Sequence, residues 1–232
     1  MRLLGAGSAA ALLAGDRLRR IFDGAPAAAA MPSCIVRPEQ TAGPYFLDEK
    51  LNRSDIRFDP ADGSVKPGLP LRLTFAVSRV DGVLCAPLPG AIVDIWQCDA
   101  LGVYSGVRDI GGRFDTSGKK FLRGYQTTNI RGIAEFLTIY PGWYPGRAVH
   151  IHFKIRSALQ GAPAQEFTSQ LYFDESVNDR VFTEAPYNSH RTRRVMNESD
   201  FIFRRGGKQL LLAPTKGPQG YTAKFDIGLQ AA

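Results

Sequence analysis

Short segments in which apolar and polar residues alternate recur along most of this chain, and they constrain its fold more than any other feature. Alternation with a period of two predicts a half-buried β-strand, because successive side chains point to opposite faces. Short strands separated by frequent turn residues predict an all-β antiparallel sandwich or barrel. The predicted strands are residues 71–77, 91–97, 121–127, 132–139, 149–155, 167–173, 209–212 and 221–229.

Two stretches lack this alternation. Residues 35–69 predict an ordered but irregular N-terminal arm with a turn at Gly43-Pro44. The aromatic residues Tyr45 and Phe46 indicate that the arm docks against another surface. Residues 175–206 are polar, basic and rich in turn residues, which predicts a long loop with a short helix.

The length of 232 residues suits one domain over residues 34–232, preceded by an Ala-rich leader over residues 1–33. Arg2 followed by residues 3–14 resembles the start of a secretory signal, and residues 25–30 offer small side chains for cleavage. This pattern favours a periplasmic or secreted protein. The alternatives are a disordered leader, a surface helix, or a start at Met31, which would leave the protein in the cytoplasm.

The sequence after this leader contains three cysteines, Cys34, Cys85 and Cys98. In an oxidising compartment two of them could pair and leave one free. We expect Cys34 to pair with Cys98, since that bond would tie the N-terminal segment to the core. Three buried thiols are the alternative.

The formal charge of +7 predicts a positive surface that would steer small anions such as aromatic carboxylates. Neither a basic helix nor a platform of interleaved aromatic residues appears, so nucleic acid is not an expected partner. No apolar run is long enough to span a bilayer. C-x-x-C, H-E-x-x-H, G-x-S-x-G and Gly-rich phosphate loops are also absent from the sequence, which gives no support to zinc-finger, serine-hydrolase or nucleotide chemistry.

Two of the three histidines, His150 and His152, lie on one predicted strand. Side chains two residues apart share a face and lie about 7 Å apart along the strand, so two imidazoles can converge on one metal ion. Pro and Gly residues surround Tyr144 in the preceding turn and direct its phenol. The alternative is a polar strand face with a tyrosine packed below a turn.

Tyr104 also follows a predicted strand and lies among glycines. If it joins Tyr144, His150 and His152, the site has two phenolates and two imidazoles. Phenolate is a hard anionic donor that favours a hard, highly charged ion, and ferric iron fits best. Two phenolates and a hydroxide would balance its three charges, whereas zinc more often takes Cys, His or carboxylate ligands.

These residues resemble those of the intradiol ring-cleavage dioxygenases, the family of catechol 1,2- and protocatechuate 3,4-dioxygenases, and in particular its small, often exported branch. The hallmark R-x-x-H-I-H-F stands at residues 147–153, G-x-Y-S places Tyr104, and P-G-x-Y-P places Tyr144. A strand motif ending in T-x-Q places Gln170. The resemblance covers about residues 34–229.

This resemblance implies a two-sheet antiparallel β-sandwich with an irregular N-terminal arm and long loops. It also implies a mononuclear non-haem Fe(3+) held by Tyr104, Tyr144, His150 and His152, without an organic cofactor. The expected partners are a small aromatic diol and O2. The diol would displace Tyr144, Arg147 would stabilise negative charge on it, and Gln170 would position it, so that O2 cleaves the ring to a muconate-type diacid.

One departure concerns assembly. The long helical dimerisation region of the larger catechol dioxygenases is absent from this sequence, which puts that interface in doubt and leaves a homo-oligomer as an open alternative. Two competing interpretations are a non-catalytic β-sandwich binding module and a metal site that serves only structure.

Overall fold

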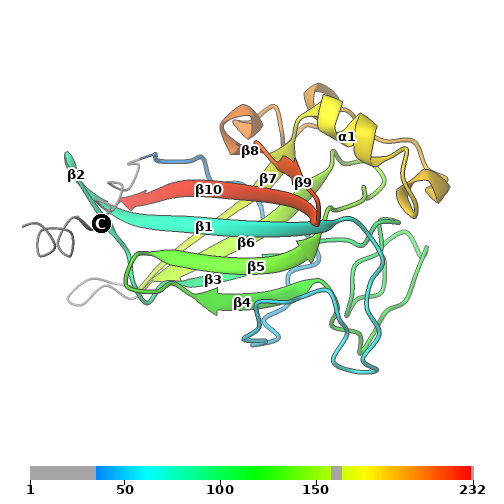
Figure 1. The fold of residues 1–232 in the computed structure, drawn as a ribbon, viewed down its shortest axis with the longest axis horizontal. Helices are drawn as coiled ribbons and strands as arrows, with labels where there is room; N and C mark the ends of the chain where they lie inside the picture. The colour runs from blue at the N-terminus through cyan, green and yellow to red at the C-terminus, as the bar shows by residue number, and fades with distance from the viewer. Residues whose placement is uncertain (1–34, 158–163, 231–232) are drawn as a thin grey trace, which may run out of the picture. The chain divides into compact units, whose positions relative to one another are not determined.

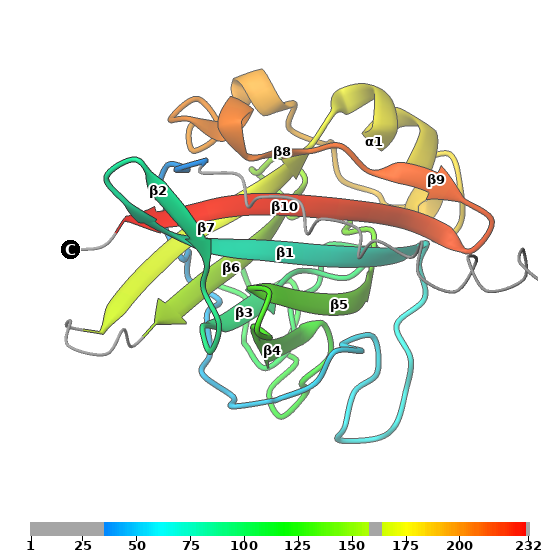
Figure 2. The ribbon, with the colours of Figure 1, turned by 60° about the vertical axis from the view of Figure 1, so that its left-hand side comes forward.

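The computed structural model describes residues 35–157 and 164–230, and two β-sheets form its framework (Figures 1 and 2). The first sheet has the order β2-β1-β10-β9, with β5 paired to β1 beside β2. The second has the order β4-β3-β6-β7-β8. The strands of the first sheet are β1 (Pro70–Asp81), β2 (Leu84–Pro87), β5 (Ile133–Ile139), β9 (Thr215–Gly217) and β10 (Gly220–Gln230). Those of the second are β3 (Ile92–Trp96), β4 (Arg123–Thr127), β6 (His150–Ser157), β7 (Gln165–Phe173) and β8 (Leu211–Leu212).

The all-β, two-sheet sandwich predicted from the sequence is confirmed, but not every strand pair is antiparallel. β1 and β10 are parallel over ten registered residue pairs, and β7 and β8 are parallel over two. β1 and β10 are the first and last strands of the domain, so no hairpin constrains their direction. Half of the predicted strand at 209–212 forms β8, Leu211–Leu212, and its first two residues belong to the 3₁₀ helix Gly207–Leu210.

Aromatic side chains fill the space between the sheets. Phe75 of β1 lies 5.3 Å from Phe153 of β6 and 5.9 Å from Phe225 of β10, measured between ring centroids. The alternation along β1 explains this arrangement, because it buries Leu71, Leu73, Phe75 and Val77 on one face.

Strand β6 differs from its prediction. Its alternation predicts a half-buried strand, yet nearly every residue from His150 to Ser157 is buried. Ile151, Phe153 and Ile155 face the first sheet, and the N-terminal arm covers part of the polar face. That covering turns a polar strand face into a closed site.

Irregular segments flank the second sheet. The arm is ordered, as predicted, and bridges β10 at Val36, β4 at Asn52 and β5 at Asp55. The region after β7 contains helix α1 (Glu175–Val181) and the short 3₁₀ helices Tyr187–Ser189 and Asn197–Ser199. Within the described ranges, no helix combines the length and the apolar character that a membrane crossing requires.

The expected pairing of Cys34 with Cys98 is wrong. Cys98 is a free, buried thiol, whereas Cys85 is disulfide-bonded. Cys98 lies two residues after the end of the buried strand β3 and packs with Trp96 and Tyr104 in one buried cluster, so the core encloses it. Cys34 and the whole predicted leader, residues 1–33, lie outside the described residues, and the export and cleavage predictions stay predictions.

Replacing Ile155 with Val should lower the free energy of unfolding by about 1 kcal/mol, because the missing methylene leaves a small void in a close-packed core. Ile155 is fully buried in β6 and points away from the histidines. Denaturant unfolding would measure the change, with the exposed Ile110→Val as the matched control. An unchanged midpoint for Ile155→Val would show that this part of the core is not packed as described.

Candidate metal centre

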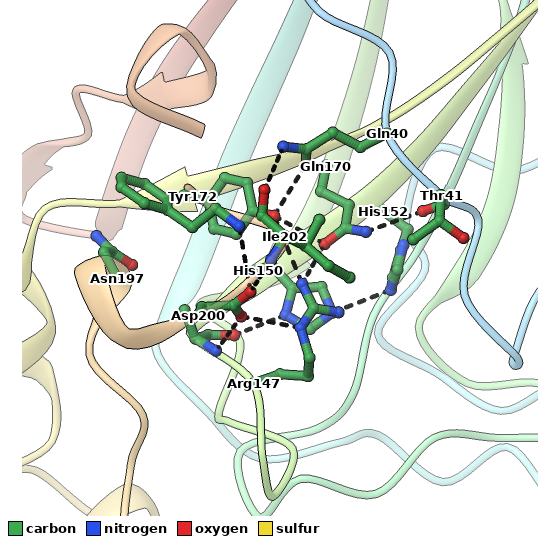
Figure 3. A network of polar contacts seen from close by, with 12 residues as sticks. Gln40, Thr41, Arg147, His150, His152, Gln170, Tyr172, Asn197, Asp200 and Ile202 are labelled. Carbon is green, nitrogen blue, oxygen red and sulfur yellow. Dashed lines mark hydrogen bonds and ion pairs between the residues drawn. The ribbon is translucent and has the colours of Figure 1, made fainter. Parts of the chain in front are cut away.

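His150 and His152 lie on the polar face of β6, and their side chains converge. Their Nε2 atoms are 3.0 Å apart, and both residues are almost completely buried. Figure 3 shows the two rings close together beside Arg147. Two ligand atoms that bind one ion at about 2.1 Å and at a right angle are about 3.0 Å apart, so this spacing is typical of adjacent ligands.

Each imidazole is oriented by a different contact. His150 Nδ1 lies 2.6 Å from the carbonyl oxygen of Ala148. A proton on Nδ1 donates to that carbonyl and leaves Nε2 as a free lone pair. His152 instead stacks on its cross-strand neighbour Trp96, with centroids 5.0 Å apart and planes 4° apart. Its Nδ1 is buried without a hydrogen-bond partner, so stacking rather than hydrogen bonding fixes this ring.

Glycine is required where the arm crosses His152. Gly43 has φ +68°, and a Cβ at this position would lie 3.2 Å from Cε1 of His152. The arm can therefore cover the histidine closely only with glycine at the turn.

Tyr104 reaches the histidines from the segment after β3. Its hydroxyl lies 3.3 Å from His150 Nε2, and the residue is 1% exposed. Arg123 of β4 secures this segment, since its guanidinium donates to the carbonyl oxygen of Ser105 at 2.6 Å and to that of Tyr45 at 2.6 Å. One buried arginine thus holds both the Tyr104 segment and the arm.

The hydroxyl of Tyr144 points elsewhere. It lies 2.6 Å from the hydroxyl of Tyr45 and donates to Asp109 Oδ1 at 3.1 Å. Its ring packs edge-on against Tyr104, with centroids 6.0 Å apart, and the guanidinium of Arg113 lies over the ring, 4.6 Å from its centroid. The structure therefore brings together three of the four predicted ligands and holds the fourth beside them.

Charge at the site follows from burial. Desolvation, with a further contribution from the nearby charge of Arg147, lowers the pKa of His150 to about 3 and that of His152 well below its usual value. Both imidazoles are therefore neutral at ordinary pH, as metal ligands must be. Burial also raises the pKa of Tyr104, so its phenolate needs a nearby cation, which a bound metal ion would supply.

Arg147 and Gln170 lie next to each other, as predicted for partners in one site. Arg147 Nη2 donates to Gln170 Oε1 at 2.6 Å, and Gln170 Nε2 donates to the carbonyl of Thr41 at 2.9 Å (Figure 3). Gln170 is directly opposite His152 in the β6–β7 ladder. Tyr172 extends the network, since its hydroxyl is 3.0 Å from Gln170 Oε1 and 2.8 Å from Gln40 Oε1.

Sequence reasoning missed several of these neighbours. Tyr45 was expected to dock but not to reach Tyr144, and nothing local identifies Asp109, Asp200 or Tyr172 as parts of the site. The PEQTAGPYF stretch, residues 38–46, was the available signal, because it carries Gln40, Thr41 and Tyr45 together.

The donor set limits which metal can bind. Within the ranges that the structure describes, no three His, Cys, Asp or Glu side chains gather into a metal site. Two imidazoles with an adjacent phenol fit a hard trivalent ion better than zinc. These residues therefore fit the predicted ferric ion.

A cavity of about 400 Å³ lies close to the tyrosines. Its wall includes Val103, the neighbour of Tyr104 in the sequence, and Pro145, the neighbour of Tyr144. Arg113, whose guanidinium lies over the Tyr144 ring, is also part of the wall. Leu101 and Phe114 make much of the remaining wall apolar.

Comparisons with known proteins agree with this geometry. A family model described as Dioxygenase matches residues 41–230. The structure of an intradiol ring-cleavage dioxygenase from Tetranychus urticae is 34% identical and superposes with a TM-score of 0.69, covering 85% of this chain and 94% of that one. The dioxygenase domain of a carbohydrate-binding fusion protein from Streptomyces sp. SirexAA-E is 29% identical with a TM-score of 0.59, covering 85% of this chain and all of that one.

A curated relative, the chlorocatechol 1,2-dioxygenase of Pseudomonas sp. (strain P51), is 33% identical in an alignment 146 residues long that covers 57% of this chain. The match spans about half the length of that relative, 53%. With the family model covering most of the chain, this protein belongs to the intradiol ring-cleavage dioxygenase family. Membership in an enzyme family removes the support for a non-catalytic binding module.

Proposed function

We propose that this protein is a ferric dioxygenase that cleaves a catechol-type diol between its two hydroxyl-bearing carbons, and that O2 contributes both of its atoms to a muconate-type diacid. The observation that carries the proposal is the convergence of two donors on the buried Nε2 atom of His150: the Tyr104 hydroxyl lies 3.3 Å away and His152 Nε2 lies 3.0 Å away. A structural metal alone would not need the polar network of Arg147 and Gln170 beside it.

In this proposal the iron ion and the protein side chains have separate roles. Bound ferric iron would hold the deprotonated diol and withdraw electron density from it, which opens the ring to O2. The chain would hold that ion with two neutral imidazoles and the Tyr104 phenolate. Arg147 supplies the positive charge that stabilises the anionic diol, and Gln170 fixes both Arg147 and the position of the ring.

Tyr144 takes two positions in this proposal. As a ligand it would complete the donor set, and its phenolate oxygen would take one of the two protons that an arriving diol loses, while the charge-balancing hydroxide would take the other. The contacts with Tyr45 and Asp109 then provide its second position. Arg113 donates twice to Asp109 and lowers the pKa of that carboxyl, so an ionised acceptor always faces the arriving phenol.

Replacing Tyr45 with Phe should raise KM for the diol about fivefold and leave kcat nearly unchanged, because losing one hydrogen bond of about 1 kcal/mol destabilises the displaced position of Tyr144. Tyr144 would then compete better with the diol. Steady-state oxygen uptake measures both constants. Tyr221→Phe on β10 is the matched control, and an unchanged or lower KM for Tyr45→Phe would contradict the second position.

The experiment that tests the function is oxygen uptake by iron-loaded protein. Catechol, hydroxyquinol, protocatechuate and bulkier diols are supplied in turn, and product absorbance identifies ring cleavage. We expect uptake of one O2 per diol and a muconate-type spectrum with at least one substrate. Iron-loaded protein that consumes no oxygen with any of these diols would refute the proposal.

A further inference from the structure

Asp200 is a fully buried acidic side chain next to Arg147, and it lies on a segment that sequence reasoning treated as a loop. It follows the 3₁₀ helix Asn197–Ser199. Its two oxygens accept four hydrogen bonds. Oδ2 accepts from Arg147 Nε at 2.8 Å and from the backbone N–H of Ala148 at 2.7 Å. Oδ1 accepts from the backbone N–H groups of Ile202 and Phe203 at 2.7 and 3.1 Å.

These contacts fix the orientation of the Arg147 side chain. A guanidinium is planar, so securing Nε at one edge and Nη2 at another determines where every N–H group points. Asp200 holds the Nε edge, and Gln170 holds Nη2. No acceptor among residues 35–157 and 164–230 contacts Nη1, which leaves its two N–H groups for a ligand beside the histidines.

The same carboxylate oxygen also supports the strand that carries the histidines. Oδ2 accepts from the N–H of Ala148, and the carbonyl of Ala148 faces His150 Nδ1 at 2.6 Å. Asp200 Oδ2 thus contacts both Arg147, which faces the substrate, and Ala148, whose carbonyl orients His150. Figure 3 shows Asp200, Arg147 and His150 in this sequence of contacts.

We infer that Asp200 is the positioning residue of this site and that it acts by setting the direction in which Arg147 presents its Nη1 N–H groups to the anionic diol. The inference rests on the proposed function. Through Asp200, the segment after α1 controls the affinity of the site for its substrate without contacting the substrate itself.

Asp200→Asn tests the inference in the iron-loaded full chain. With the amide oxygen facing Ile202 and Phe203, the NH2 group faces the N–H groups of Arg147 and Ala148, where a donor meets donors. The substitution keeps the contacts that form the turn and removes those on the Arg147 side. We expect kcat/KM to fall about 10- to 100-fold, as for partners that orient metal-site residues. The Kd for catechol, measured without oxygen from the absorbance change, should rise about tenfold, which is the lower limit of the effect expected on kcat/KM.

A double-mutant cycle separates positioning from a general loss of structure. In an Arg147→Ala background, Asp200→Asn should lose most of its effect on Kd, because the guanidinium that it positions is gone and only the contact with the N–H of Ala148 remains. Asp179→Asn, which removes an exposed partner of Arg194 in the same region, is the matched control and should leave Kd unchanged. If Asp200→Asn does not fold, Asp200→Ser carries the same test, since its hydroxyl can still accept from Ile202.

The outcomes distinguish this inference from the proposed function. Equal Kd values for wild type and Asp200→Asn, or an equal effect of Asp200→Asn with and without Arg147, would overturn the positioning role alone. Wild-type protein that binds catechol but consumes no oxygen would overturn the proposed function, while the Kd values still test Asp200. Wild-type protein that binds no diol would overturn both.

Discussion

Replacing Tyr104 with Phe is expected to lower kcat/KM by more than about 100-fold, beyond the cost of losing an outer partner of a metal ligand. The substitution removes one oxygen atom and keeps the ring that packs 4.8 Å from Tyr45. It deletes Tyr104 Oη, which is the anionic one of the three donors that converge, and a ferric ion favours anionic oxygen donors. Iron content and the visible tyrosinate-to-iron absorbance should both fall.

Tyr140→Phe is the matched control for this substitution. Tyr140 is fully buried, and its hydroxyl donates to Asn178 at 2.7 Å. Its loss should lower the free energy of unfolding by about 1 kcal/mol and leave iron content and colour unchanged. Full activity and colour in Tyr104→Phe would show that this phenol is not a ligand.

Replacing Arg147 with Ala should lower kcat/KM by about 100- to 1,000-fold, the usual cost of removing one preorganised group that stabilises developing charge. The iron content should not change, because Arg147 is not one of the proposed ligands. Stability should fall as well, since the substitution leaves the carboxylate of Asp200 buried without its cation.

Arg147→Lys distinguishes charge from geometry. Lysine keeps the positive charge, but a single ammonium cannot reproduce the planar fork that meets Asp200 and Gln170 together. We expect stability to recover more than activity, as measured by thermal unfolding and oxygen uptake. Arg147→Ala with activity within about threefold of wild type would contradict a role in charge stabilisation of the expected size.

Local patterns predicted much of this molecule. The alternation around Phe75 and Phe153 indicated strands whose apolar faces form one core, and the two-residue spacing of His150 and His152 indicated adjacent ligands. The place of Tyr104 after a strand left its role open, and its G-x-Y-S motif, through the family resemblance, made it a candidate ligand. In each case a short stretch contains the whole signal, because strand periodicity and turn composition are local properties.

What the sequence could not predict depends on contacts between distant residues. Asp200 meets Arg147 across 53 positions, and Tyr45 meets Tyr144 across 99. The parallel pairing of β1 with β10 brings together the first and last strands, which no local pattern records. The expected Cys34–Cys98 bond was wrong for the same reason, since only the fold shows that Cys98 is enclosed with Tyr104.

The central claim is that the phenol of Tyr104 and the imidazoles of His150 and His152 surround one ferric ion. Anomalous diffraction at the iron edge, from crystals of iron-loaded protein without diol, tests it most directly. We expect a single peak within about 2.5 Å of Tyr104 Oη and both Nε2 atoms, with Tyr144 turned from Asp109 toward the ion. An iron peak away from these three atoms, or none in protein that consumes oxygen with diols, would contradict the account.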